Sequence, residues 1–366
     1  MRILLTGGGT AGHINPAVAI AKYAVSMDND TQILFVGKRG GMESRLVPAE
    51  GFDIKYVDVE GLVRKVSLSN VVTMIKLIEA VRETGKIIDE FKPDVVVGTG
   101  GYVCAPAIIA ANRKKIPTLI HEQNVFPGSA IKFLSKKSTV TAISFAETQK
   151  YLTGAKKVVF TGNPVRPNIM SINYDGARAA LGLGREKFIV AFGGSLGAKK
   201  INDVIVQYIE KINGEDGVRL CFATGIANYE GVLQSLRTKG ITPRDNIEIV
   251  KYINNMDIVM NAADLVIARS GAITVSELCV LGKPSILIPS PNVTNNHQEY
   301  NARVLDDRDA SVMILEKDFN IDSLSTTVDR ILRSASESRI MSINAKKIGI
   351  ADATDIIYKQ LKDITK

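Results

Sequence analysis

The chain has 366 residues, of which 45% are hydrophobic and 23% charged, with a formal net charge of +8. This length fits two domains of ~150 residues each, and the composition is that of a folded protein rather than a disordered one. No apolar run approaches the ~20 residues that span a membrane, and we expect no signal peptide. Cys104, Cys221 and Cys279 lack CxxC spacing, so we expect buried thiols rather than disulfides or a zinc site.

The basic balance favours an anionic partner, such as a phosphorylated substrate, an anionic lipid or nucleic acid. Nucleic acid is disfavoured because the chain has no tryptophan, only 6% aromatic residues and no RNP-like or zinc-finger motif. We therefore expect a phosphorylated ligand or a lipid surface, and no nucleic acid.

The first half alternates short apolar strands with helices. We expect helices over 16–27 and 69–91, and strands over 2–6, 32–36, 94–97, 118–120 and 158–160. Pro16 suits the first turn of a helix, and Pro93 ends the helix before it. The run GNPVRP at 162–167 then breaks the pattern and predicts an interdomain hinge.

The second half repeats this rhythm, with expected strands at 188–192, 219–223, 248–250, 265–268 and 285–288. Alternation of this kind predicts an α/β fold with parallel sheets covered by helices on both faces. Such sheets bind ligands at the carboxyl ends of their strands. The apolar residues of 355–361 predict a final helix that packs on another element.

Each half opens with an apolar strand, a glycine-rich turn and a helix, in GGGTAGH at 7–13 and GGSLGA at 193–198. The first turn matches GxGxxG, but the next strand ends in VGKR and lacks the acidic residue of a dinucleotide site. No GxxxxGK[ST] motif is present either. The two loops predict either backbone-amide cradles for phosphate or sugar, or simply tight turns.

Three polar positions suggest chemistry, each with a structural alternative. His13 follows the first glycine loop, where an imidazole is suited to accept a proton near neutral pH or to cap the helix. Glu277 lies one turn into a helix, where its carboxylate is suited to a ribose diol or is merely solvated. The amide-rich run 294–298 suits sugar hydroxyls or caps a helix. The sequence contains neither an HExxH motif nor a cluster of carboxylates, so we expect no metal site built by the protein.

Eight stretches together resemble the MurG family of GT-B glycosyltransferases: GGGTAGHINPAVAIA, GLVRK, PDVVVGTGGYV, HEQNVFPG, TGNPVR, GGSLGAKKIN, RSGAITVSEL and NVTNNHQEYNA. The resemblance implies two Rossmann-like α/β domains with parallel sheets facing a deep cleft. Residues 1–163 would form the acceptor and membrane-facing domain, and residues 164–351 the UDP-GlcNAc donor domain. The helix 352–366 would pack back on the first domain.

The resemblance also implies an inverting transfer of N-acetylglucosamine from UDP-GlcNAc to the 4-hydroxyl of undecaprenyl-diphospho-muramoylpentapeptide (lipid I). The product would be lipid II, for peptidoglycan synthesis. It implies no cofactor and a peripheral location on the cytoplasmic face of the cell membrane, against anionic lipid. The alternatives are another GT-B UDP-sugar transferase, a UDP-GlcNAc epimerase-like enzyme, or a nucleotide-sugar-binding or membrane scaffold protein.

By the same resemblance, His13 is the expected general base, with Glu122 and His121 as weaker candidates. Residues expected to bind UDP-GlcNAc are Thr10, Ala11 and Gly12 near the sugar and diphosphate, Asn124 at the transferred sugar, Arg166 and Ser195 at the diphosphate, Ile253 at the uracil, Glu277 at the ribose, and Gln298 at the GlcNAc hydroxyls.

Two apolar segments flanked by basic residues are suited to bind anionic lipid, unless their apolar residues pack in the core. The first contains Val71, Val72, Met74, Ile75, Leu77 and Ile78, near Arg64, Lys65 and Lys76; the second contains Ile131, Phe133 and Leu134, beside Lys132, Lys136 and Lys137.

Overall fold

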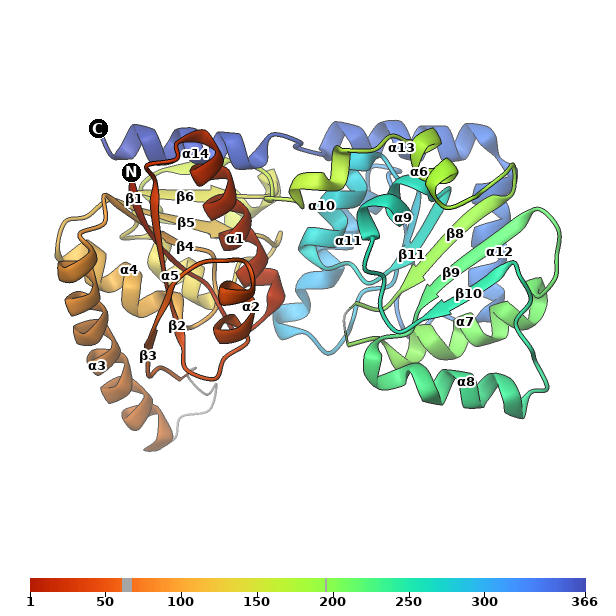
Figure 1. Cartoon of the computed structure of the whole chain (residues 1–366), viewed down its shortest axis with the longest axis horizontal. Helices are drawn as coiled ribbons and strands as arrows, with labels where there is room; N and C mark the ends of the chain where they lie inside the picture. Colours follow the sequence, from red (N-terminus) through yellow and green to blue (C-terminus); the bar gives the residue numbers. More distant parts are fainter. Residues whose placement is uncertain (61–67, 195) are drawn as a thin grey trace. The chain divides into compact units, whose positions relative to one another are not determined.

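The predicted alternation of strands and helices folds into two parallel sheets, which confirms the α/β class (Figure 1). The computed structural model describes residues 1–60, 68–194 and 196–366, without the side chains of 68–72 and 167. The chain divides into two units. Unit 1 comprises Met1–Val165 and Ile350–Lys366, and unit 2 comprises Arg166–Gly349.

Unit 1 contains a seven-stranded sheet in the order β3-β2-β1-β4-β5-β6-β7. Its strands are β1 (Arg2–Thr6), β2 (Gln32–Lys38), β3 (Ile54–Val57), β4 (Val95–Gly98), β5 (Thr118–Glu122), β6 (Val140–Ile143) and β7 (Val158–Phe160). Its helices are α1 (Ala11–Met27), α2 (Glu43–Ala49), α3 (Leu68–Phe91), α4 (Cys104–Arg113), α5 (Ser129–Ser135) and α14 (Ala353–Ile364). The strand order reverses between β1 and β4, where such sheets bind ligands.

The C-terminal helix α14 packs on α1 within unit 1 (Figure 1). Ile357, Tyr358 and Leu361 are buried in the cluster formed by α1 and one face of the sheet. The Tyr358 ring meets Tyr23 edge-on at 5.8 Å, and the Tyr23 hydroxyl donates a 2.9 Å hydrogen bond to Asp355. Helices α3, α4 and α5 contribute to the core on the opposite face.

Unit 2 contains a six-stranded sheet in the order β10-β9-β8-β11-β12-β13, which reverses between β8 and β11. Its strands are β8 (Lys187–Phe192), β9 (Val218–Ala223), β10 (Ile247–Val250), β11 (Leu265–Ala268), β12 (Ser285–Leu287) and β13 (Val312–Met313). Its helices are α6 (Tyr174–Ala180), α7 (Lys199–Ile212), α8 (Tyr229–Thr238), α9 (Met256–Ala262), α10 (Ala272–Leu281), α11 (His297–Asp306), α12 (Ile321–Arg333) and α13 (Ala335–Ile348).

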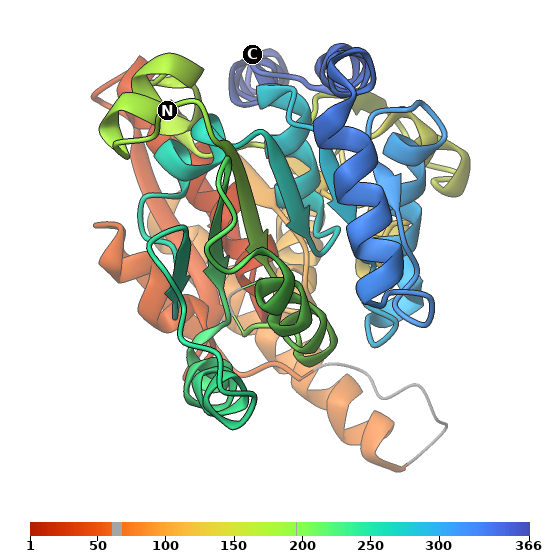
Figure 2. The ribbon, with the colours of Figure 1, turned by 90° about the vertical axis from the view of Figure 1, so that its right-hand side faces the viewer.

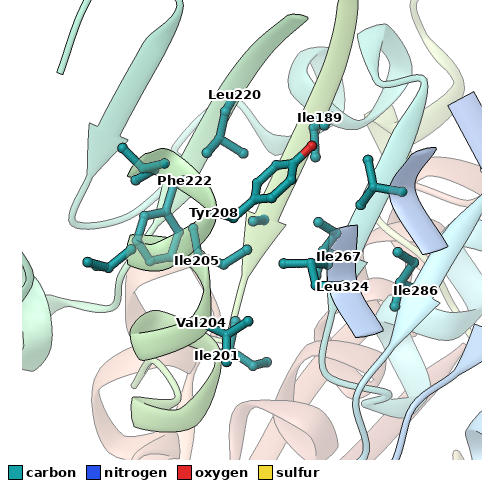
Figure 3. Packing of buried hydrophobic residues seen from close by; sticks show 14 of the residues in the cluster. Ile189, Ile201, Val204, Ile205, Tyr208, Leu220, Phe222, Ile267, Ile286 and Leu324 are labelled. Carbon is teal, nitrogen blue, oxygen red and sulfur yellow. The ribbon is translucent and has the colours of Figure 1, made fainter. Parts of the chain in front are cut away.

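The core of unit 2 lies between its sheet and helices α7, α8 and α12. Tyr208 of α7, Phe222 of β9 and Leu324 of α12 point into it together (Figure 3). In the turned view, α12 runs alongside the sheet (Figure 2). The strands of both sheets therefore pack against apolar clusters formed with the helices. The loops that contain the predicted site residues follow the carboxyl ends of these strands.

Two local predictions about structure have clear outcomes. The expected start of the first helix at Pro16 is wrong, because α1 begins at Ala11, directly after the glycine loop. Pro16 therefore lies in the second turn, where it removes one backbone donor from the helix. The prediction of buried thiols is confirmed, since Cys104, Cys221 and Cys279 are all buried and unpaired.

Candidate functional site

The loops after β1 and β4 cross at the point where the strand order of unit 1 reverses. The Gly8 amide donates to the Gly100 carbonyl at 3.4 Å. Gly101 has φ +78°, and a Cβ there would lie 2.3 Å from the Gly8 carbonyl oxygen. Only glycine permits this crossing, so the loops form a close-packed floor at the carboxyl edge of the sheet.

Thr10, Ala11 and Gly12 follow this floor, Thr10 as the residue before α1 and the other two as its first residues. Below them, the buried Glu43 carboxylate accepts hydrogen bonds from the amides of Gly9 (3.2 Å) and Lys38 (2.9 Å). The Gly9 amide is therefore unavailable to an anion. Nothing in the sequence pattern indicates this use of Glu43, and the ligand contacts of Thr10, Ala11 and Gly12 stay predictions.

His13 lies half-buried in the first turn of α1. Its Nδ1 is 3.0 Å from Oε1 of Gln123. A Cβ at Gly100 would lie 2.6 Å from the same Nδ1, so the absence of a side chain there makes room for the imidazole. Within the described part of the chain, Nε2 of His13 makes no hydrogen bond. That nitrogen is the atom with which His13 would take a proton from a ligand.

Glu122 is buried at the end of β5, and its carboxylate orders the loop that follows. Oε1 accepts hydrogen bonds from the amide (2.9 Å) and the side chain (3.1 Å) of Asn124, and Oε2 accepts one from the Gly128 amide (2.8 Å). These bonds support a positioning role for Glu122. Its catalytic role and the sugar contact of Asn124 stay predictions.

His121 is fully buried, and both of its ring nitrogens have partners. Nε2 lies 2.9 Å from the Gly162 carbonyl oxygen, and Nδ1 lies 2.9 Å from Nε2 of Gln123. Burial lowers the pKa of His121 to about 4, because an apolar interior disfavours the imidazolium. The ring is neutral at pH 7, which supports a structural role.

This lowered pKa predicts that unit 1 loses stability on acidification. Between the ordinary pKa near 6.5 and the folded pKa of about 4, the unfolded state binds more protons at His121 than the folded state does. We expect a loss of about 2 kcal/mol in the free energy of unfolding of unit 1 between pH 7 and pH 5. Urea unfolding at both pH values measures it. A His121→Gln variant should show a smaller pH dependence, and an equal one would contradict the assignment.

Unit 2 contains a pocket of about 520 Å³ at the point where its strand order reverses. Its lining comes from the segments after β8, β11, β12 and β13 and includes Gly193, Gly194, Gly197, Lys199, Lys200, Arg269, Thr274, Ser290, Gln298 and Glu316. Gly197 has φ +75°, and a Cβ there would lie 2.1 Å from the Thr224 carbonyl oxygen. The second predicted loop thus borders a pocket at the N-terminus of α7. Ser195 lies outside the described residues.

The predicted sugar-binding amide, Gln298, is held at the rim of this pocket. Its Oε1 accepts a 2.9 Å hydrogen bond from the Ser290 amide, and its carbonyl accepts a 2.8 Å bond from the Ser270 hydroxyl. Arg269 donates to the Ile288 and Pro289 carbonyls at 3.1 Å and pairs with Glu316. The charge of Arg269 is therefore partly neutralised.

Arg166 and Glu277 form an ion pair, although 111 residues separate them. Arg166 Nη2 donates a 3.1 Å hydrogen bond to Oε2, and Nε lies 2.8 Å from Oε1 without an aligned N–H. Glu277 is 1% exposed and Arg166 45% exposed. Burial raises the pKa of Glu277, and Arg166 opposes the rise. Oε1 has no aligned hydrogen bond in the described structure, but the atom is itself buried, so the ribose contact of Glu277 stays a prediction.

This pairing supports a positioning role for Arg166, since its guanidinium orients Glu277. The predicted diphosphate contact of Arg166 stays a prediction. Ile253 follows β10 with its side chain buried. Because the side chain is buried, only the main chain of Ile253 is available to a ligand. The predicted contact with the uracil would therefore be made by the main chain, and it stays a prediction.

Comparison with known proteins identifies the chain. The N-terminal domain model of glycosyltransferase family 28 matches residues 3–143, and the C-terminal domain model matches residues 188–357. The protein is thus a family 28 glycosyltransferase. A relative from Acetivibrio thermocellus is 48% identical over 367 residues, covering 100% of this chain and 99% of the relative. It is named UDP-N-acetylglucosamine--N-acetylmuramyl-(pentapeptide) pyrophosphoryl-undecaprenol N-acetylglucosamine transferase, and this chain belongs to that family, the MurG family.

Solved structures agree with this assignment. The crystal structure of MurG from Acinetobacter baumannii superimposes with a TM-score of 0.77 at 26% identity, covering 99% of each chain, which confirms the GT-B fold. A UDP-GlcNAc 2-epimerase from Neisseria meningitidis, solved with UDP-GlcNAc, has a TM-score of 0.69 at 15% identity and covers 99% of this chain and 100% of its own. The latter likeness concerns the fold alone, so the epimerase alternative is not favoured.

Proposed function

We propose that the chain transfers N-acetylglucosamine from UDP-GlcNAc to the 4-hydroxyl of the muramoyl unit of lipid I, which yields lipid II for peptidoglycan. Membership of the MurG family supports both substrates. The observation that supports binding of UDP-GlcNAc is the pocket of unit 2. Thr274 of α10 lines this pocket, and the buried Glu277 carboxylate follows about one turn later in the same helix. A carboxylate can accept a hydrogen bond from each hydroxyl of a ribose diol. Because Oε1 is itself buried, the proposal requires the partly exposed Arg166 to move aside when the donor binds.

The remaining donor contacts follow from the pocket lining. The glycine loop after β8 and the N-terminus of α7 offer backbone amides and a positive dipole end to the diphosphate. Lys200 adds positive charge at the same end of the helix, whereas Lys199 is paired with Asp203 at 2.7 Å. Gln298 has a side-chain amide nitrogen with no hydrogen bond in the described structure, and this group is suited to a sugar hydroxyl.

The reaction is a single displacement with inversion. The acceptor oxygen bonds to the anomeric carbon as the bond from that carbon to the diphosphate oxygen breaks, and His13 Nε2 takes the hydroxyl proton. The sugar passes through an oxocarbenium-like transition state, while negative charge grows on the departing UDP. Amides and Lys200 around the unit 2 loop stabilise that charge. We propose that no protein-bound metal is required.

The experiment that tests this function measures UDP release with and without a lipid-linked muramoyl acceptor, in the presence of a chelator. Release that requires the acceptor, with β-linked disaccharide as product, supports the proposal. An epimerase would instead change the free nucleotide sugar without any acceptor. A binding or scaffold protein would bind UDP-GlcNAc and turn over neither substrate.

We further propose that unit 1 binds the anionic inner leaflet of the membrane. Among the described residues, no helix combines the length and apolarity needed to cross a bilayer. Met74, Ile75 and Ile78 on α3 and Phe133 on α5 are exposed, whereas Ile131 and Leu134 are buried in the core. Val71 and Val72 have no described side chains, and Arg64 and Lys65 lie outside the described residues. Phe133 lies beside Lys132, Lys136 and Lys137 in the sequence, and an exposed apolar side chain among basic residues suits peripheral attachment.

Replacing Ile75, Ile78 and Phe133 together with glutamate is expected to weaken binding to phosphatidylglycerol vesicles at least ~10-fold. The change removes apolar insertion and adds charge that anionic lipid repels. Vesicle co-sedimentation measures the effect. Glutamate at Ile340, Ile343 and Met170 of unit 2 is a matched control, since these residues are 52%, 44% and 58% exposed, against 52%, 44% and 56% for Ile75, Ile78 and Phe133. Equal binding of the triple variant and the control would contradict the proposed membrane face.

A further inference from the structure

Gln123 is buried between His13 and His121. The hydrogen-bond partners around its side chain show which end is the amide oxygen and which is the amide nitrogen. Its Nε2 lies 2.8 Å from the Thr99 carbonyl oxygen and 3.1 Å from that of His121. Carbonyl oxygens only accept hydrogen bonds, so the NH₂ group must occupy this side. The amide oxygen Oε1 therefore faces Nδ1 of His13 at 3.0 Å.

The protons on His121 follow from the same reasoning. Its Nε2 faces the Gly162 carbonyl at 2.9 Å, so Nε2 carries the proton and donates it. Burial lowers the pKa of His121 to about 4, so the neutral ring has a bare Nδ1. That Nδ1 accepts the second N–H of Gln123 at 2.9 Å. The two hydrogens of the Gln123 NH₂ group thus have three acceptors, of which the Thr99 carbonyl at 2.8 Å and Nδ1 of His121 at 2.9 Å are the nearest.

This row of hydrogen bonds, from His121 through Gln123, ends at His13, where only one tautomer fits. Oε1 of Gln123 is an acceptor, so Nδ1 of His13 must donate to it. We propose that Gln123, supported by His121, is a positioning residue that holds neutral His13 with its proton on Nδ1 and its lone pair on Nε2. This inference rests on the proposed function, in which His13 is the general base. The inference specifies that Nε2 is the atom of His13 that accepts the proton, and that Gln123 keeps the ring in the tautomer with a lone pair on Nε2.

Thr99 links Gln123 to the backbone of His13. Its carbonyl accepts from Gln123, and its hydroxyl donates a 2.7 Å hydrogen bond to the carbonyl oxygen of His13. Thr99, the residue after β4, thus holds both the backbone of His13 and the side-chain amide of Gln123 that orients the His13 ring. When Nε2 takes a proton, Nδ1 still donates to Gln123, so no partner in the row has to rearrange. Such preorganisation favours proton transfer.

Imidazole ¹⁵N chemical shifts test the tautomer in the unmodified protein. The chain has only 3 histidines, so each signal can be assigned by its loss in a single variant. We expect Nδ1 of His13 to be protonated and Nε2 to be bare, and the reverse for His121. A bare Nδ1 in neutral His13 would overturn the proposal, whether or not any variant folds.

Gln123→Met tests the consequence, because methionine keeps the volume but accepts no comparable hydrogen bond. We expect His13 to lose its Nδ1–H form and kcat to fall ~10–100-fold, as when a partner orienting a functional histidine is removed. The KM for UDP-GlcNAc should stay within about twofold, since Gln123 belongs to unit 1. Gln149→Met, at an exposed glutamine of the same unit, is the matched control.

The outcomes separate this inference from the proposed function. An unchanged kcat in Gln123→Met, with or without a change of tautomer, would overturn the positioning role. If His13→Ala retained turnover, the base assignment would fail, while the ¹⁵N shifts would still report the tautomer. A lowered kcat with an altered His13 tautomer and a normal Gln149→Met variant supports the inference.

Discussion

Replacing His13 with alanine is expected to lower kcat by ~10²–10⁴-fold, the usual contribution of a general base. Nε2 is the only ring nitrogen of His13 without a hydrogen bond in the described structure, so the variant removes the atom that takes the acceptor proton. The affinity for UDP-GlcNAc should stay within about twofold, because the donor pocket is formed within unit 2. Steady-state turnover and calorimetric titration with UDP-GlcNAc measure the two effects.

Ser26→Ala, at the exposed far end of the same helix, controls for perturbation of α1. The His13 variant should also keep the thermal transition of unit 1, since the half-buried imidazole makes one hydrogen bond there. Turnover within a few-fold of the unmodified enzyme would reject His13 as the base. It would return attention to Glu122, whose carboxylate would then have to leave its three loop hydrogen bonds.

Replacing Glu277 with glutamine is expected to weaken UDP-GlcNAc binding by roughly 10–100-fold, the size of one lost hydrogen bond to a charged group. Glutamine keeps the shape but offers one acceptor oxygen where the carboxylate offers two. Calorimetric titration measures the loss. Glu210→Gln is the matched control, because Glu210 is an exposed, ion-paired glutamate of the same unit. Equal donor affinities in the two variants would remove Glu277 from the site.

The same carboxylate predicts how donor affinity depends on pH. Burial raises the pKa of Glu277, and the partly exposed Arg166 opposes this rise. A carboxyl with a raised pKa takes up its proton at a higher pH than an exposed glutamate does. Donor affinity should therefore weaken on acidification before exposed carboxylates titrate. The Glu277→Gln variant should lack this component, since its side chain does not titrate.

Much of the fold is predictable from the sequence, because apolar strands that alternate with helices and proline breaks are local signals. The strand expected at 2–6 is observed at Arg2–Thr6, and the helix expected from 69 ends, as predicted, before Pro93. The strands β3 and β6 are not predicted, although β4 and β7, which are no longer than these, are. Such strands owe their formation to neighbours in the sheet rather than to their own pattern.

The site is less predictable, since its contacts join distant segments. The glycine loops and His13 follow from motifs, but 110 residues separate His13 from Gln123. The sequence indicates Arg166 and Glu277 as separate ligands, whereas the structure pairs them. Ile131 and Leu134 look lipid-facing beside lysines, yet the sheet buries them. Only packing decides which face of such a helix is covered.

The return of α14 to unit 1 has a consequence for synthesis on the ribosome. Unit 2 is an insertion within unit 1, so its 166–349 segment emerges whole before the last piece of unit 1 exists. Until then, α1 lacks the cover of Ile357, Tyr358 and Leu361, of which the two aliphatic side chains each contribute about 1.5–3 kcal/mol on burial. The nascent N-terminal unit thus exposes an apolar stripe that favours aggregation, and a chain released early at Gly349 would keep it exposed.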